Sequence, residues 1–434
     1  MARHLQLRHL TFFAAAAPPV AFDFDPGLNV IFSGSSNAAN LIIESVDFVL
    51  GAARKPMLAR FGFNKVVLSI EGSDGTLFTL ERNIGGAAIR VYDGLPVPDA
   101  PAGNVRTISP KHNPLAPDNI SRFLLDRIGL GEALHWAKED ETFKNLSFRS
   151  IAHYFIVNEH DIHKEGSLIE TGQSRAPNFE LSLFDLLHGN HNPEAARLTE
   201  TDSTLQLLRL ARLQTLESII ETAKRHLERG TGSLEVTGHS NLEPSRSDAG
   251  QHRQSLDSQP LRGLIEELED RLSALSWLTR RVGEHAEPAA IETESPEERL
   301  CQCVAQLLSE WDMPNAETIE FDPSTRDLIV NECPRGGLNK LGRGIVHAAF
   351  KIALLKLARR INLPHAGFVL MHAPFIESRA RDSDDDASMA IMKSRFYETL
   401  SDFESGQLIV IQRGASMAGV TARVQRADFT ERPS

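Results

Sequence analysis

Apolar and polar positions alternate near the start of the chain and predict three short strands, at 4–13, 20–24 and 28–33. The third strand runs into a glycine, and a helix is expected over 37–50. The apolar residues of that helix recur at spacings that place them on one face: Ile42, Ile43, Val46, Val49 and Leu50. The order of strand, glycine and helix makes Gly34 the first position to examine for chemistry.

The same alternation continues beyond the helix and predicts a set of antiparallel strands. Strands are expected at 66–70, 77–80 and 88–92, and the segments between them are rich in the turn residues Gly, Asp and Asn. Helical stretches around 117–137 and a segment at 148–157 complete a first lobe, which is expected to end near residue 190.

The middle of the chain follows a different pattern. Two runs carry apolar residues at alternating spacings of three and four, as in the seam of a coiled coil: Leu213, Leu216, Ile220, Ala223 and Leu227, then Leu261, Ile265, Leu268, Leu272 and Leu275. The segment between them, 230–259, is polar and glycine-rich. We therefore expect a short antiparallel coiled-coil arm with polar linkers over 191–297, between lobes at 1–190 and 298–434.

The last lobe again alternates helices and strands. Helices are expected at 298–311, 344–360 and 387–403, and strands at 327–331, 367–371 and 408–411. Alternation of this kind is typical of an α/β core.

The amino-acid composition indicates the general class of protein and its expected location in the cell. Hydrophobic residues make up 41% of the chain and charged residues 24%, which is ordinary for a globular protein, and the net charge is -12. Three cysteines supply neither a disulfide framework nor a metal quartet, so a reducing, cytoplasmic location is expected. The run at 12–17 is too short for a signal segment, and no apolar run is long enough to cross a membrane.

The loop that begins at Gly34 has the layout of a phosphate-binding P-loop, whose pattern is G-x-x-x-x-G-K-[ST]. Its positions are filled, in order, by Gly34, Ser35, Ser36, Asn37, Ala38, Ala39, Asn40 and Leu41. The second Gly, the Lys and the Ser/Thr of the pattern are therefore missing. Taken alone, this stretch is better explained as an ordinary strand-to-helix turn that binds nothing.

Longer stretches beside this loop resemble the ABC-type ATPase heads of chromosome maintenance and repair, a class that includes the SMC, RecF-like and double-strand-break-repair families. Gly27-Leu28-Asn29-Val30-Ile31 and Phe48-Val49-Leu50-Gly51 resemble the sequences that flank the P-loop in this class. Residues 338–344 resemble its signature loop and 364–375 its Walker B strand. The resemblance covers both ends of the chain, is nearest to short-armed bacterial members, and implies a P-loop NTPase head split by the coiled-coil arm.

The resemblance also shows which catalytic groups are replaced. The P-loop Lys binds phosphate and the Ser/Thr holds magnesium, but Asn40 and Leu41 stand at these positions. His372 and Ala373 stand where the Walker B strand would carry a magnesium-binding Asp and, in some classes, a catalytic Glu. The signature-like loop keeps its glycines and cations, and the resemblance implies that they face a partner's nucleotide: Arg335, Lys340, Gly342, Arg343 and Gly344.

These replacements predict a pseudo-ATPase that has no catalytic residues, no metal ligands and no cofactor. Such a head would work by forming a homodimer or heterodimer, for instance with an active relative whose site it completes, in DNA maintenance or in defence against phages or plasmids. DNA is a candidate ligand and a membrane is not. Two alternatives stay open: an active ATPase with non-standard phosphate and magnesium ligands, to which ATP and magnesium would bind, and an interaction scaffold with no nucleotide role. The segment 160–163, with two histidines, is expected to be surface.

Overall fold

The computed structural model of the chain describes residues 3–15, 17–95, 105–113, 116, 118–130, 134–137, 142–171, 177–189, 294–375, 383–414, 422–427 and 429. Met1–Asn190 and Glu294–Ser434 form one compact unit, and His191–Thr293 form a second. The predicted coiled-coil arm lies outside the described residues. All the described residues belong to the first unit.

A six-stranded antiparallel sheet forms one layer of this unit. Its strands in spatial order are β2 (Val20–Asp23), β1 (Leu5–Ala14), β4 (Phe63–Gly72), β5 (Leu77–Asn83), β6 (Ile89–Asp93) and β7 (Val105–Ile108). In β1 the buried residues change phase, from Leu5 and Leu7 to Leu10 and Phe12. The pairing of β1 with β4 shifts between Leu7 and His9, and this bulge turns the second half of the strand so that both halves face the core.

The second large sheet is parallel throughout and draws its strands from both ends of the chain. Its spatial order is β10 (Ile156–Val157), β14 (Phe368–His372), β15 (Gln407–Arg413), β3 (Gly27–Ser33) and β16 (Arg423–Ala427). The central strands are buried on both faces, which explains why their sequences are apolar runs and not alternating patterns.

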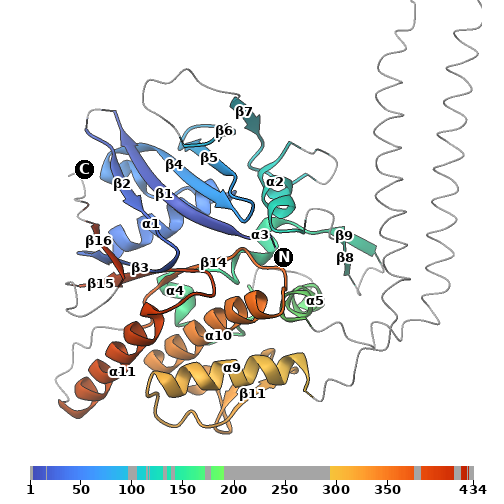
Figure 1. Cartoon of the computed structure of the whole chain (residues 1–434), viewed down its shortest axis with the longest axis vertical. Coiled ribbons are helices and arrows are strands. Elements are labelled where there is room, and N and C mark those ends of the chain that lie inside the picture. The colour runs from blue at the N-terminus through green and yellow to red at the C-terminus, as the bar shows by residue number, and fades with distance from the viewer. Residues whose placement is uncertain are drawn as a thin grey trace, which may run out of the picture. The chain divides into compact units, whose positions relative to one another are not determined.

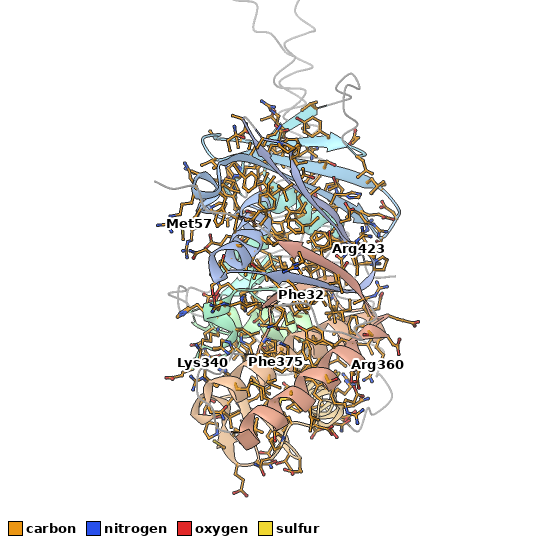
Figure 2. The ribbon with its side chains drawn as sticks, turned by 90° about the vertical axis from the view of Figure 1, so that its left-hand side faces the viewer. Phe32, Met57, Lys340, Arg360, Phe375 and Arg423 are labelled. Atoms are coloured by element: carbon orange, nitrogen blue, oxygen red, sulfur yellow. The ribbon has the colours of Figure 1, made fainter. Side chains whose placement is uncertain are left out.

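Helix α1 (Ser36–Val49) packs between the two large sheets, and the remaining long helices cover the opposite face of the parallel sheet (Figure 1). Those helices are α9 (Pro296–Glu310), α10 (Lys340–Arg360) and α11 (Ser383–Ser401). Helix α10 is buried on nearly every side along its middle, between β14 and α9. Lys340 and Arg360, at its two ends, lie on opposite sides of the molecule in Figure 2.

Shorter elements complete the unit. The helices are α2 (Ile120–Arg127), α3 (Phe148–Ala152), α4 (Glu159–Ile162) and α5 (Pro177–His188), with 3-10 turns η1 (Leu58–Phe61) and η2 (Arg335–Gly337). A three-stranded sheet contains β11 (Ile319–Asp322), β12 (Asp327–Val330) and β13 (Cys333–Pro334), and a hairpin contains β8 (Leu134–Ala137) and β9 (Thr142–Asn145). Among the described helices, none has the length and apolar character that a membrane span requires.

The predicted α/β class is confirmed by these layers, and most predicted elements lie within a few residues of the observed ones. The helix expected around 117–137 is wrong in its second half, because α2 ends at Arg127 and 134–137 is a strand. Gly129 follows the helix with φ +79°, a left-handed conformation that commonly ends helices. Strand β16 was also missed, and it follows the strand that was expected to be the last.

A buried glutamine joins the two large sheets. Gln407, at the start of β15, is fully buried. Its side-chain oxygen accepts a hydrogen bond from the backbone N–H of Leu7 at 2.9 Å, and its amide donates to the carbonyls of Leu7 at 2.8 Å and Asp25 at 3.0 Å. The side chain therefore satisfies three backbone groups, on β1 and on the segment before β3, that are distant in the sequence.

We expect Gln407→Leu to lower the free energy of unfolding by about 3 kcal/mol, because it leaves the N–H and carbonyl of Leu7 and the carbonyl of Asp25 without this partner. Urea denaturation followed by circular dichroism measures the change. Gln302→Leu, on the exposed face of α9, is the matched control and should change stability by less than about 0.5 kcal/mol. Equal effects of the two substitutions would contradict this role of Gln407.

Candidate functional site

The connection from β3 to α1 is much shorter than a P-loop. Strand β3 ends at Ser33 and α1 begins at Ser36, so only Gly34 and Ser35 lie between them. Ser35 caps the helix: its hydroxyl accepts from the N–H of Ala38 at 3.1 Å, and its carbonyl accepts from the N–H of Ala39 at 3.1 Å. The positions expected to wrap around phosphate groups are therefore already the first turn of a capped helix.

This geometry has a direct consequence for phosphate binding. A P-loop binds phosphates with backbone N–H groups that point to a common centre. Here the N–H groups of Ala38 and Ala39 are bound within the chain. An added Cβ at Gly34 would meet no atom within 4 Å, and Gly34 is not among the glycines with positive φ, so the turn does not require glycine.

The next positions point into the protein. Ala39 and Leu41 are 0% and 1% exposed and belong to the core between the two sheets, whereas Asn40 is half-buried. In a P-loop the residue at position 41 would hold magnesium through a hydroxyl. Leu41 instead contributes apolar contacts, so the side of α1 that would carry the metal ligand serves as packing surface.

The Walker B-like position, like Leu41, is part of the packed interior. His372 ends β14 and is 4% exposed, with Nδ1 3.3 Å from the carbonyl oxygen of Ala373. Burial lowers the pKa of His372, so the imidazole is neutral at pH 7. The backbone N–H of Ala373 donates to Ile411 at 2.9 Å, which continues the sheet. Neither side chain offers the oxygen ligands that magnesium prefers.

In the signature-like loop, Arg335 makes a buried structural contact. It is 0% exposed and pairs with Asp327 through Nε and Nη2, each 2.8 Å from a carboxylate oxygen. It also donates to the backbone carbonyls of Lys164 at 2.9 Å and Gly166 at 2.5 Å. With these bonds the guanidinium ties the segment after α4 to β12 and η2.

The neighbouring residues are also engaged within the chain. Arg343 donates to the carbonyls of His163 at 3.0 Å and Leu338 at 2.7 Å, and Gly342 donates its N–H to the Asn339 side chain that caps α10. A Cβ added at Gly344 would lie 2.6 Å from Nδ1 of His163, so a glycine is needed for α4 to approach α10. Lys340, by contrast, is exposed at the helix start (Figure 2).

The structure thus brings the Walker B-like and signature-like segments together within one chain. The added Cβ at Gly344 would also lie 3.0 Å from the carbonyl oxygen of Pro374, just after β14. His163 stands between the two segments and is 8% exposed, so its expected surface position is wrong, while His160 of the same segment is exposed. No spacing in the sequence indicates that His163 belongs to this site.

A group of buried basic side chains, some of them on α10 itself, was not indicated by the sequence. Lys351 is 1% exposed, donates to the carbonyl of Leu168 at 3.3 Å, and lies over the ring of Tyr154 at 4.8 Å. Burial lowers its pKa well below the usual value, and the charges of Lys164 and Arg335 lower it further. The nearby His153 and His347 have lowered pKa values, first because they are buried.

No family model matches the sequence, and no curated protein matches it. Among solved structures, the chain is similar to the Smc head domain of Pyrococcus furiosus, crystallised with an extended coiled coil and bound to the C-terminal domain of ScpA. The identity is 11% and the TM-score 0.45, covering 96% of this chain and 91% of that one. It is also similar to the recombination mediator RecF bound to ATP, at 12% identity and a TM-score of 0.34, covering 97% and 94%. At such scores the likenesses agree with the resemblance noted above and add no argument about activity.

We expect Arg335→Met to cost about 3–5 kcal/mol in the free energy of unfolding, because it leaves the carboxylate of Asp327 buried without its cation. Urea denaturation measures the loss. Replacing both partners, as in Arg335→Met with Asp327→Leu, should recover part of it, since no unpaired charge then remains. Lys340→Met is the exposed control and should stay within about 0.5 kcal/mol of the parent.

Stability should fall as the pH drops from 6.5 towards 4. Burial is the first cause of a lowered pKa at six histidines, reaching about 4 at His163 and about 3 at His365: His112, His153, His163, His347, His365 and His372. Below about pH 6.5 the unfolded chain binds protons at these residues and the native protein does not, so acid favours unfolding by up to about 1.4 kcal/mol per pH unit for each residue.

Urea denaturation at pH 7, 6 and 5 tests this dependence. His365→Asn should reduce the slope by about one proton, because asparagine keeps an acceptor for the Gly367 N–H but does not titrate. His160→Gln, at an exposed position, should leave the slope unchanged. A stability that stays constant from pH 7 to pH 5 would contradict the prediction.

Proposed function

We propose that this chain is a non-catalytic ABC-type head, a pseudo-ATPase that acts as a structural or regulatory subunit in a DNA-maintenance or defence complex. The observation that carries the proposal is the two-residue connection from Ser33 to Ser36, which replaces a phosphate-binding loop by a capped helix. The buried, neutral His372 at the opposite strand end supports it, because the second half of a magnesium site is missing too.

In this role the protein acts by assembling with a partner and not by catalysis. A head without its own phosphate loop can still complete the site of a partner head if it presents a helix start to the partner's nucleotide. Helix α10 begins with the exposed Lys340, and the side chain of Asn339 caps that start. We therefore propose a homodimer or a heterodimer with an active relative, in which Lys340 is the contact to test and Arg335 and Arg343 stabilise the loop from within.

DNA is the proposed ligand of a basic groove at the far end of α10. The groove has a volume of about 610 Å³ between α9 and α10, and its lining includes Arg299, Lys356, Arg359 and Arg360 against the single carboxylate of Glu404. In a chain with a net charge of -12 this local excess of cations is unusual. Cations gathered in this way attract the phosphate backbone of nucleic acids.

Isothermal titration of the full chain with ATP, with and without magnesium, tests the nucleotide part of the proposal. We expect no saturable binding in the micromolar range under either condition, because the N–H groups of Ala38 and Ala39 are hydrogen-bonded to Ser35 and the side chain of Leu41 is buried. The alternative of an ATPase with displaced ligands requires micromolar, magnesium-dependent binding that Asn40→Ala weakens, and this result would overturn the proposal.

Fluorescence anisotropy with a labelled DNA duplex at several salt concentrations tests the groove. Replacing Lys356 and Arg360 by Glu should weaken binding at least tenfold and reduce the dependence of log affinity on log salt by about 2. Lys55→Glu, an exposed cation outside the groove, should have little effect. If deleting 205–282 abolishes binding to a partner protein and the groove substitutions change nothing, the protein is an interaction scaffold.

A further inference from the structure

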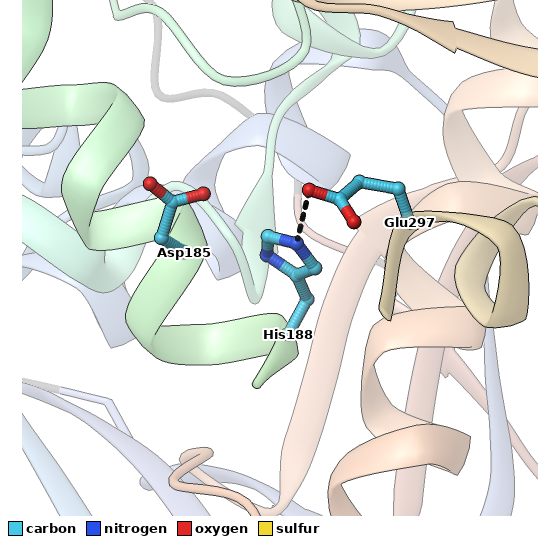
Figure 3. A group of neighbouring side chains, drawn as sticks. All are labelled: Asp185, His188 and Glu297. Carbon is cyan, nitrogen blue, oxygen red and sulfur yellow. Dashed lines mark ion pairs between the residues drawn. The ribbon is translucent and has the colours of Figure 1, made fainter. Parts of the chain in front are cut away.

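Three side chains that are well separated in the sequence converge beside the end of α5 (Figure 3). Asp185 and His188 are three residues apart on α5 and share one side of that helix. Glu297 comes from the first turn of α9. One nitrogen or oxygen atom from each of the three residues lies within 4.8 Å of those of the other two.

The hydrogen bond made by His188 determines which of its two ring nitrogens carries the proton. Nδ1 lies 2.6 Å from the carbonyl oxygen of Phe184. A carbonyl only accepts hydrogen bonds, so Nδ1 carries the proton, and in a neutral imidazole Nε2 is left with a lone pair. The side chain is 0% exposed, and Nε2 has no hydrogen-bond partner among the described residues.

The atom nearest to that lone pair is itself an acceptor. Nε2 lies 3.7 Å from Oε1 of Glu297, which is longer than a hydrogen bond (Figure 3). The buried Nε2 of His188, which has no hydrogen-bond partner among the described residues, therefore lies next to a group that also only accepts, and a cation between the two atoms would satisfy both.

The distances suit a metal ion as that cation. A tetrahedral ion with bonds of about 2.0–2.2 Å holds its ligand atoms about 3.3–3.6 Å apart, close to the separation of Nε2 and Oε1. The carboxylate of Asp185 needs to move towards the other two groups by about 1 Å. The bond from Nδ1 to the Phe184 carbonyl also fits, because metal-binding histidines donate their second N–H to such a group.

We propose that Asp185, His188 and Glu297 bind one divalent transition-metal ion, with Zn²⁺ as the reference ion. One imidazole and two carboxylates form a ligand set suited to zinc, and a water molecule completes the coordination. The ion joins the end of α5 to the first turn of α9, and these two helices come before and after the second unit, His191–Thr293, in the sequence. It therefore fixes the two points at which the chain leaves and re-enters the first unit.

Zinc titration of chelator-treated full-length protein tests the site, with calorimetry for affinity and Co²⁺ absorption for ligand geometry. We expect one equivalent of Zn²⁺ to bind and the midpoint of thermal unfolding to rise on binding. His188→Gln, Asp185→Asn and Glu297→Gln should each weaken binding at least tenfold. His160→Gln removes an exposed histidine elsewhere and should leave both readouts unchanged.

Two results would overturn the proposal. If Glu297→Gln and Asp185→Asn bind Zn²⁺ as the parent does, the ion is held adventitiously by surface histidines. If the parent binds no Zn²⁺ and ¹⁵N resonances show His188 protonated on both nitrogens at pH 7, the cluster is a plain ion pair. Should His188→Gln fail to fold, the two carboxylate variants still decide, since they keep the size of the side chain. None of these measurements depends on ATP.

Discussion

The hydrogen-bonded pairing of β3 with β15 and β16 is the interaction on which the rest of the unit depends. Strand β3 comes from the first 33 residues, and both of its neighbours come from the last 28. The register aligns Ile31 with Ile411, and Ile411 is aligned in turn with His372 on β14. The loop after β3 and the end of β14 therefore reach the same edge of the sheet only when both halves of the chain are folded together.

At that edge, side chains that the resemblance associates with nucleotide chemistry take part in internal packing. Leu41 fills the core, His372 is buried and neutral, and Gly344 allows α10 to approach His163. Arg335 uses its donors on Asp327 and on backbone carbonyls. The arrangement at this edge is thus maintained by contacts that need no nucleotide, which is the physical basis for proposing a role in assembly.

The sequence predicted elements whose periodicity is local, and it missed features that depend on distant partners. Strand β3 and helix α1 are accurate because apolar runs and helical spacing are intrinsic to them. The replacements at Asn40, Leu41 and His372 were also evident from the sequence. The sequence could not show that α1 begins at Ser36, since capping by Ser35 depends on how tightly the chain turns after β3. His163 and the cluster of Asp185, His188 and Glu297 were missed because only tertiary contacts assemble them.

The order of the strands in the parallel sheet has a consequence during synthesis. Both edges of β3, with its apolar residues Val30, Ile31 and Phe32, pair only with strands that begin at residue 407 or later. At translation rates of roughly 5–20 residues per second, these edges lack their native partners for about 20–75 s on the ribosome. An unpaired apolar strand readily joins other chains. Newly made chains are thus exposed to aggregation until their last strands emerge, and a chaperone that binds near the N-terminus would protect them.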